Sequence, residues 1–234
     1  VKLTYLNSSI LLSTCNLELI AIFESLEKCL ETKTARLANL VQLRGQKRVM
    51  TTCTVKNGVV EEFSHVSLSG VGVRVLVDDK SWGFSSTNIL DFERVRQTLE
   101  NSLKLAKASS KLKKQKVMLA PVKEAKADVS TPVKKSLRDF SIEDVVEIPL
   151  EAYNGAREAG PRVADAKATY ISIEDEKYFL SSEGSHIRQN TARLLLLVDV
   201  IAKSNSLLCP ASENLGHSGG LELFDKATPH SLGK

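Results

Sequence analysis

The stretch GVGVRVLVDDKSWGFSSTN, from Gly70 to Asn88, decides the fold of this 234-residue chain. Valines occupy every second position over residues 71–77, which is the period of a half-buried strand. The polar residues 78–80 then predict a turn. A short return strand follows and carries the chain's one tryptophan, Trp82. The stretch therefore predicts an antiparallel hairpin.

The residues before this hairpin predict a helix followed by further strands. Apolar residues recur every three or four positions over residues 14–32, which places them on one helical face. Residues 41–55 and 59–67 have the pattern of strands, and Asn57-Gly58 separates them. Asn-Gly favours a type I′ turn, in which both central residues have positive φ. Together with the hairpin, these runs predict an antiparallel meander of about four strands.

The residues after the hairpin repeat the order of helix and strands. Residues 91–107 carry an apolar stripe behind the capping candidates Asn88 and Asp91, so they predict a helix. A second helix is expected over residues 150–159, where Gly160-Pro161 would end it. The strands expected next cover residues 162–173, 177–182 and 187–202.

These elements predict an α+β fold of two successive units, each with helix packed on mostly antiparallel sheet. Four regions are expected along the chain. They are a helix, meander and helix over residues 1–108, a flexible Lys-rich loop over 109–137, a second helix-plus-sheet unit over 138–203, and a Gly/Ser-rich tail over 204–234.

The net charge of +4 conceals a basic strip between Lys104 and Lys135. Ten lysines there stand against Glu124 and Asp128, so the strip carries +8. It has no aromatic residue to stack on bases and no arginine to read their edges. A solvated loop is therefore favoured over a nucleic-acid contact, and nucleic acid is not an expected partner.

The sequence shows no catalytic or metal-binding motif. Its four cysteines form no C-x-x-C pair, and its four histidines form neither H-E-x-x-H nor H-E-x-x-x-H. No apolar run reaches the roughly 20 residues of a membrane-spanning helix. Thr4 and Asn7 interrupt the N-terminal apolar residues, which argues against a signal peptide. We therefore expect a cytoplasmic chain without catalytic residues, metal ligands or a membrane partner.

The hairpin at residues 70–88 resembles the N-terminal domain of the TldD/PmbA (TldD/TldE) metallopeptidase family. The later elements keep that family's order, and SSEGSHIRQ at residues 181–189 resembles its second characteristic turn. GHSGGLELFD at residues 216–225 resembles its Gly-rich segment, which ends in an aromatic residue. The resemblance runs from about residue 15 to about residue 228.

The resemblance implies a zinc peptidase assembly in which this chain lacks the zinc. TldD-type members hold H-E-x-x-x-H on a helix of a C-terminal domain, where zinc activates a water molecule. We expect that domain to lie beyond Lys234, so this chain is expected to hold no cofactor and to be inactive alone. TldE/PmbA-type members lack the motif and act as partners of TldD. The implied partners are therefore a TldD/TldE-like chain, in a homo- or heterodimer, and a peptide substrate.

Eight residues are candidates for peptide binding or for a subunit interface. Trp82 and Phe84 share a strand face, as core or interface anchors commonly do. Arg74 interrupts the valine series on the opposite face, so we expect it to face solvent or to pair with Glu61 or Glu62. A peptide can bind by adding a strand to the edge of a sheet, and we expect this at the sheet edge near residues 183–189. The candidates are Arg74, Trp82, Phe84, Glu183, Gly184, Ser185, Ile187 and Gln189.

The sequence favours a non-catalytic N-terminal region of a TldD/PmbA-type zinc metallopeptidase assembly that contributes to dimerisation and peptide channelling. Two alternatives stay open. One is a stand-alone peptide- or protein-binding module, and the other is a nucleic-acid-associated protein that uses the strip from Lys104 to Lys135.

Overall fold

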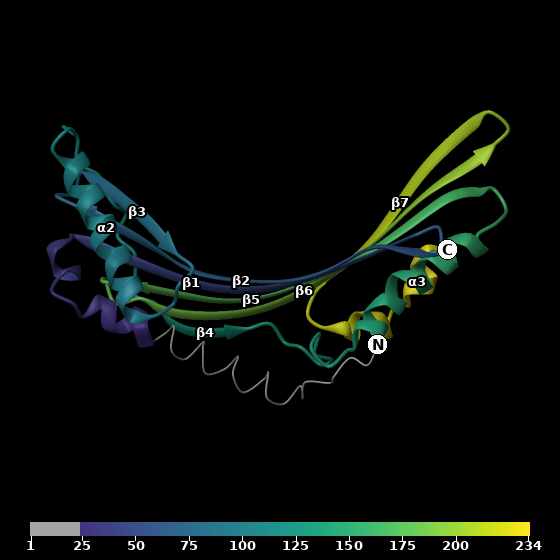
Figure 1. The fold of residues 1–234 in the computed structure, drawn as a ribbon, viewed down its shortest axis with the longest axis horizontal. Helices are drawn as coiled ribbons and strands as arrows, with labels where there is room; N and C mark the ends of the chain where they lie inside the picture. Colours follow the sequence, from purple (N-terminus) through teal and green to yellow (C-terminus); the bar gives the residue numbers. More distant parts are fainter. Residues whose placement is uncertain (1–23) are drawn as a thin grey trace, which may run out of the picture. The chain divides into compact units, whose positions relative to one another are not determined.

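The structure is a computed structural model that describes residues 24–234 (Figure 1). Residues 24–30 are helical, as the sequence predicts, and residues 31–32 form a turn; residues 14–23 of that predicted helix lie outside the described residues. The elements that follow are η1 (Ala35–Leu37), β1 (Leu40–Lys56), β2 (Val59–Val77), β3 (Ser81–Thr87), α2 (Phe92–Ser110), β4 (Lys126–Ser130), α3 (Ile142–Glu158), β5 (Val163–Ser181), β6 (His186–Ser204), β7 (Leu207–Ser218), η2 (Leu221–Asp225) and α4 (Pro229–Gly233).

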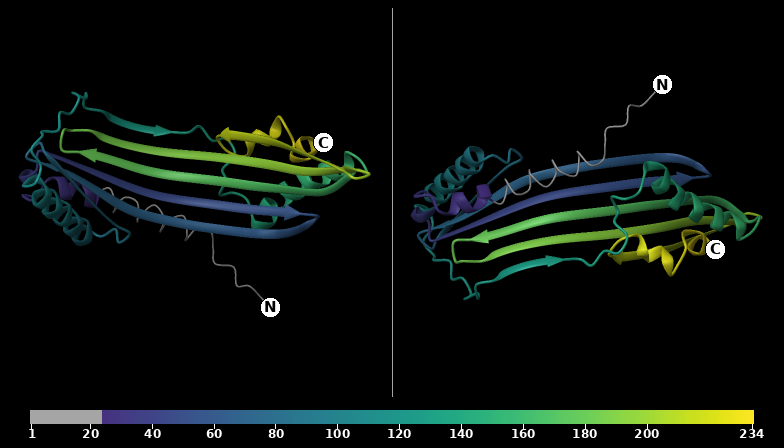
Figure 2. Two further views of the ribbon diagram at one scale, coloured as in Figure 1. Left: turned by 90° about the horizontal axis from the view of Figure 1, so that it is seen from above. Right: turned by 90° about the horizontal axis from the view of Figure 1, so that it is seen from below.

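The strands form one seven-stranded sheet in the order β3-β2-β1-β5-β6-β4, and β7 also pairs with β6. The β2–β3 and β6–β7 pairs are antiparallel. Figure 2 shows β5 and β6 running side by side, with β4 next to β6. Helices combined with an antiparallel sheet confirm the predicted α+β class.

The turns of the first meander confirm the predicted turn chemistry. Asn57 and Gly58 join β1 to β2 with φ of 50° and 80°, so both have the positive φ of a type I′ turn. Asp78 and Asp79 join β2 to β3 with φ of 56° and 50°. The predicted count of about four strands is wrong, because residues 59–77 form the single strand β2.

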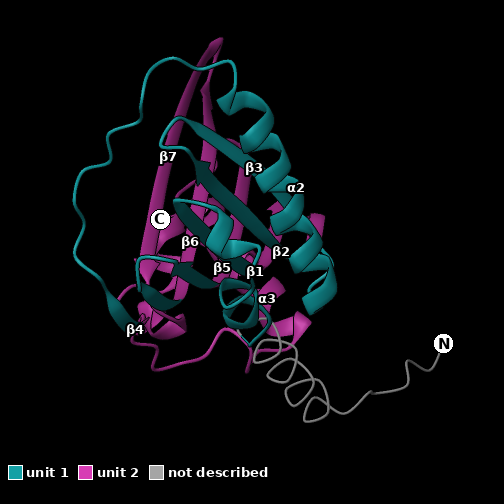
Figure 3. Ribbon diagram, turned by 90° about the vertical axis from the view of Figure 1, so that its left-hand side faces the viewer, with its two compact units in different colours: residues 1–47, 69–128, 177–189 teal, residues 48–68, 129–176, 190–234 magenta. Residues whose placement is uncertain are grey.

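The chain divides into two compact units, and each unit is made of three chain segments (Figure 3). Unit 1 contains residues 1–47, 69–128 and 177–189, of which residues 24 onward are described. Its core includes the odd-numbered valines of β2, the apolar stripe of α2, Val41 and Leu43 of β1, and Tyr178 and Leu180 of β5. This packing follows from the period of two in the strand and the period of three to four in the helix.

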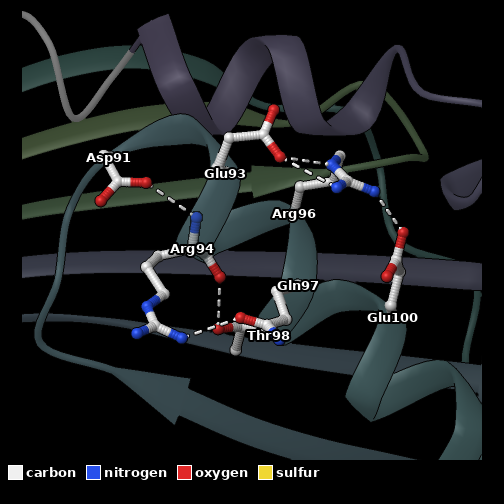
Figure 4. Close-up of polar contacts among 7 residues, drawn as sticks. All are labelled: Asp91, Glu93, Arg94, Arg96, Gln97, Thr98 and Glu100. Atoms are coloured by element: carbon white, nitrogen blue, oxygen red, sulfur yellow. Dashed lines mark hydrogen bonds and ion pairs between the residues drawn. The ribbon is translucent and has the colours of Figure 1, made fainter.

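Helix α2 begins where the sequence predicts. The side chain of Asp91 accepts a hydrogen bond from the backbone N–H of Arg94 at 2.8 Å (Figure 4). On the exposed side, Arg96 lies between Glu93 and Glu100 and pairs with both. These pairs lie three and four residues apart, the spacing at which side chains meet on a helix.

Gly83 allows α2 to lie directly on β3. A Cβ atom at this position would lie 1.9 Å from the carbonyl oxygen of Ser102 in α2. Next to this contact, the Ser85 hydroxyl donates to the carbonyl oxygen of Thr98 at 2.8 Å. The glycine between Trp82 and Phe84 therefore sets the distance between helix and sheet.

Unit 2 contains residues 48–68, 129–176 and 190–234. Its core packs Val145, Ile148, Ala152 and Ala156 of α3 against even-numbered residues of β5 and β6. Helix α3 begins with a capping box, in which Ser141 and Asp144 exchange side-chain and backbone hydrogen bonds. The predicted second helix started at residue 150, so the prediction missed the first two turns of α3 and the position of Pro149 inside it.

Several stretches that the sequence predicts to be irregular contain regular structure. Strand β4 lies within the Lys-rich stretch at residues 109–137, and all five of its residues are exposed. Strand β7, η2 and α4 lie within the Gly/Ser-rich stretch at residues 204–234. Twelve paired positions join β6 to β7, and the turn between them contains Asn205 with φ of 54°.

Candidate functional site

Three of the predicted site residues form one exposed cluster in unit 1, which we call the Arg74 platform: Arg74, Trp82 and Phe84. Arg74 lies directly opposite Phe84 in the β2–β3 pair, and opposite residues point to the same face. Trp82 is two residues from Phe84 and shares that face. The guanidinium carbon of Arg74 lies 3.8 Å from the centroid of the Trp82 ring.

The Arg74 platform lies on the sheet face opposite α2, since the neighbouring residues Gly83 and Ser85 contact that helix. Phe84 is 62% exposed, Arg74 is exposed and Trp82 is half-buried. The sequence predicted solvent or a glutamate partner for Arg74. In the structure, Arg74 is exposed and its guanidinium group stacks on the Trp82 ring, which places a cation over an aromatic face. Aromatic and arginine side chains of this kind are enriched at protein interfaces.

The other five predicted residues lie in unit 1, with Glu183, Gly184 and Ser185 in the turn between β5 and β6 and Ile187 and Gln189 in the first residues of β6. Gly184 has φ of 97°, which allows the tight reversal, and the side chain of Glu124 lies against it. Glu183 and Gln189 are exposed, while Ser185 and Ile187 are half-buried. The structure does not describe a contact between this group and the Arg74 platform.

The edge of β6 beside this turn is paired with residues of the same chain. The N–H of His186 donates to the carbonyl oxygen of Ala125 at 2.8 Å, and the N–H of Ala125 donates to the Ser185 hydroxyl at 3.2 Å. Strand β4 continues this pairing along β6. An added peptide strand would therefore have to displace the segment around Ala125 and β4.

A polar cluster in unit 2, which sequence reasoning missed, surrounds the fully buried carboxylate of Asp175. Arg48 donates from Nε to Oδ1 at 2.7 Å and from Nη2 to Oδ2 at 2.9 Å. Arg193 donates from Nη2 to Oδ2 at 3.3 Å. Hydrogen bonds and charge from Asp175 raise the pKa of Arg48 above its ordinary value. We call these three residues the Asp175 cluster.

Unit 2 also has a surface pocket of about 320 Å³ beside α3 and η2. Phe140 and Phe224 contribute apolar surface, and several carboxylates line it. Two of these carboxylates already have partners, because Asp144 caps α3 and Asp225 pairs with Lys135. Of the four carboxylates that line the pocket, this leaves Glu147 and Glu151.

The residues that the structure describes do not fit a zinc site. Among residues 24–234, no group of three or more histidine, cysteine, aspartate or glutamate side chains is placed to hold a metal ion. Two histidines lie beside an acid, His186 at 3.4 Å from Glu27 and His230 at 3.1 Å from Glu158. Over the same described range, no helix combines the length and apolar character needed to span a membrane.

The chain matches two models of one protein family and two curated relatives. Residues 41–106 match domain 1 of the PmbA/TldA metallopeptidases, and residues 135–234 match their central domain. A metalloprotease of Methanocaldococcus jannaschii is 27% identical over 202 residues, which cover 86% of this chain and 43% of that protein. A metalloprotease of Methanothermobacter thermautotrophicus is 26% identical over 77% of this chain and 38% of that protein. The chain thus spans less than half the length of these relatives.

Solved structures share the fold at low sequence identity. A proposed modulator of a DNA gyrase from Thermotoga maritima has a TM-score of 0.70 and 16% identity, over 90% of this chain and 46% of that one. TldE from Thermococcus kodakarensis has a TM-score of 0.65 and 15% identity, over 89% of this chain and 46% of that one. The two family models together cover most of the chain in the expected order. The chain belongs to the PmbA/TldD family of metallopeptidases, of which it contains the first and central domains.

Proposed function

We propose that this chain is the non-catalytic N-terminal and central part of a PmbA/TldD-type zinc metallopeptidase assembly. It contributes to dimerisation with a TldD/TldE-like chain and guides peptides toward a zinc centre that another domain or chain supplies. The match to both family domains supports this proposal.

The Arg74 platform is the surface that we assign to subunit contact. It combines an exposed phenylalanine with a tryptophan that a stacked arginine covers, and it lies opposite the packed helix. Burying Phe84 against a partner would remove apolar surface from water, which favours association. Replacing Phe84 with serine should weaken the dimer, whereas Leu105→Ser, at a residue of α2 that is 52% exposed, should not.

Size-exclusion chromatography with light scattering measures this difference for the chain alone and with a TldD-like partner. A dimer in the unchanged protein that the Phe84→Ser variant loses supports the assignment. If the Phe84→Ser and Leu105→Ser variants dimerise equally well, subunit contact must lie on another surface.

The catalytic part of the proposal has its own test. The 234-residue chain should not cleave peptides by itself. Mixing it with a chain that bears H-E-x-x-x-H should give peptidase activity that a chelator removes and zinc restores. Chelator-sensitive cleavage by the chain alone would contradict the proposal.

We place peptide contact at the β5–β6 turn. The backbone pairing of His186 with Ala125, a residue next to strand β4, supports this placement. A bound peptide should compete with the residues around Ala125, so amide exchange in residues 125–131 should become faster when peptide is added. Unchanged exchange there would move the peptide contact elsewhere.

A further inference from the structure

The Asp175 cluster lies on the face of the unit 2 sheet that is opposite α3. Even-numbered residues of β6, such as Leu194 and Leu196, pack in the core with α3. The odd-numbered Arg193 therefore points to the other face, because side chains alternate along a strand. The same alternation applies to Asp175, since Ala168 and Tyr170 of β5 belong to the α3 core. The three charged side chains thus meet on a face that α3 does not cover.

Asp175 holds both guanidinium groups in place. Its side chain is 0% exposed, whereas those of Arg48 and Arg193 are 38% and 50% exposed. Arg48 lies side-on against the carboxylate through two short hydrogen bonds, and Arg193 contacts the same carboxylate through one nitrogen. The buried carboxylate therefore holds two partly exposed guanidinium groups in fixed positions.

The arginines keep hydrogen-bonding capacity beyond Asp175. Each guanidinium has five N–H donors. Within residues 24–234, Arg48 uses Nε and Nη2 and Arg193 uses Nη2, so both Nη1 groups and Nε of Arg193 remain available. One carboxylate also leaves one positive charge uncompensated among the three side chains. An exposed, fixed guanidinium with unused donors is suited to a second carboxylate.

The surroundings of Arg193 favour an organic acid over an isolated ion. The Thr191 hydroxyl lies on the same face two residues away, is buried, and has no hydrogen-bond partner within the described residues. Ile173 of β5 and Leu195 and Leu197 of β6 are half-buried on that face. A peptide carboxylate can accept from the exposed Arg193 while neighbouring apolar groups of the peptide cover the isoleucine and leucines.

We propose that Arg48 and Arg193, fixed by Asp175, bind a carboxylate group of a peptide on the sheet face opposite α3. This inference rests on the proposed function in that it assigns a substrate class, peptides with a free C-terminus or an acidic side chain, to a peptide-handling assembly. Arg193 makes the contact with the incoming carboxylate, and Arg48 adds charge and a second set of donors.

The binding test uses the 234-residue chain and unlabelled peptides, with affinity measured by isothermal titration calorimetry. Arg193→Gln should weaken binding of a peptide with a free C-terminus by about tenfold, because a charge-assisted hydrogen bond is lost. Arg193→Lys keeps the positive charge but loses the planar arrangement of N–H donors in the guanidinium group. The peptide affinity of this variant should therefore be intermediate. Arg94→Gln is the matched control, since it removes one exposed arginine on α2 and should leave affinity unchanged.

Three versions of the peptide identify the source of the carboxylate. One has a free C-terminus, one is the amide, and one is the amide with an added internal aspartate. The amide should bind about tenfold more weakly than the acid. If the internal aspartate restores the affinity of the amide, the site accepts any peptide carboxylate. If it does not, the site recognises the C-terminal carboxylate. Equal binding of acid and amide would overturn the proposal.

A second measurement avoids dependence on the folding of a variant. In the unchanged protein labelled with ¹⁵N, acetate should shift the Nε–H resonance of Arg193, whereas chloride at the same ionic strength should not. No shift with acetate would overturn the proposal. Tighter binding of a single-stranded oligonucleotide, lost in Arg193→Gln, would also overturn it in favour of phosphate recognition.

The two proposals fail in different ways. If the mixed assembly has zinc-dependent peptidase activity but the Arg193→Gln variant binds and processes acidic peptides normally, only the carboxylate site is wrong. If carboxylate binding is found but no partner restores peptidase activity, the site stands and the assembly role is wrong.

Discussion

The guanidinium group of Arg74 stacks on Trp82 with 3.8 Å between the guanidinium carbon and the ring centroid. Trp82 is the one tryptophan of the chain, so all tryptophan emission comes from the ring that Arg74 stacks on. Arg74→Ala should change the emission maximum of the folded protein and lower its unfolding free energy by about 0.5–1 kcal/mol, the range for an exposed cation–π pair. Emission spectra and urea unfolding measure the two effects.

The control for this prediction is Arg44→Ala. Arg44 lies 5.1 Å from the ring of Phe179 and makes the same kind of contact with a different aromatic residue. It should leave the tryptophan emission unchanged. An unaltered spectrum in Arg74→Ala would show that the stacked geometry is not maintained in solution.

Replacing Gly83 with alanine should separate α2 from β3. The added Cβ would lie 1.9 Å from the carbonyl oxygen of Ser102, and a backbone atom of a packed helix cannot move aside at low cost. We expect a loss of about 3 kcal/mol or more in unfolding free energy, at the upper end for overpacking. Denaturant unfolding followed by circular dichroism measures the change.

Gly216→Ala provides the comparison, because it also adds a methyl group in a strand. Its Cβ would meet Leu195 at an ordinary distance of 3.4 Å. This variant should be within about 0.5 kcal/mol of the unchanged protein. Similar losses in both variants would mean that strand glycines matter for a reason other than the contact with α2.

The stability of unit 2 should fall at acidic pH through Glu222. Its carboxylate accepts hydrogen bonds from the backbone N–H groups of Gly220, Lys134 and Lys135 at 3.0–3.3 Å, and these bonds lower its pKa to about 2. Because the folded pKa lies below the ordinary value of 4.5, the stabilisation is complete above pH 4.5. It is lost as the pH falls toward 2.

Urea unfolding at several pH values between 6 and 2 tests this sign. The stability difference between the unchanged protein and Glu222→Gln should be largest above about pH 4.5 and should shrink as the carboxylate becomes protonated. Glu213→Gln, on exposed β7, should follow the unchanged protein throughout. A difference that grows with acidity would contradict the assigned hydrogen bonds.

Removing the buried acid of the Asp175 cluster should destabilise unit 2. Asp175→Ala leaves Arg48 and Arg193 close together without their shared carboxylate. We expect a loss of about 2–3 kcal/mol, below the value for a fully buried pair because both arginines stay partly exposed. Asp199→Ala, at an exposed residue of β6, should cost less than about 0.5 kcal/mol in the same unfolding experiment.

Local chemistry made part of this fold predictable. Asn57-Gly58 and the Asp91 cap each act within a few residues, and the structure shows both where the sequence indicates them. The start of α3 could also have been found, since Ser141 and Asp144 have the spacing of a capping box. The prediction instead started the helix after Pro149, although a single proline inside a helix can be offset by tertiary packing.

Long-range pairing explains what the sequence did not predict. Strand β7 lies in the stretch whose Gly and Ser content predicted an irregular tail. Its strand structure depends on pairing with β6 along its whole length. In the Asp175 cluster, Arg48 pairs with an acid 127 residues away in the sequence, so no local sequence pattern predicts this contact. For the Arg74 platform, alternation could place Trp82 and Phe84 on one face, but the stacking of Arg74 depends on the β2–β3 register.

Strand β7 exposes nearly all of its twelve residues, and Pro210 interrupts its row of N–H groups opposite Ile201. An exposed strand edge is a template on which other chains can aggregate. Proline cannot donate a hydrogen bond to an added strand, and the charge of Glu213 disfavours close stacking of identical chains. Together these two residues disfavour the addition of a further strand at this edge.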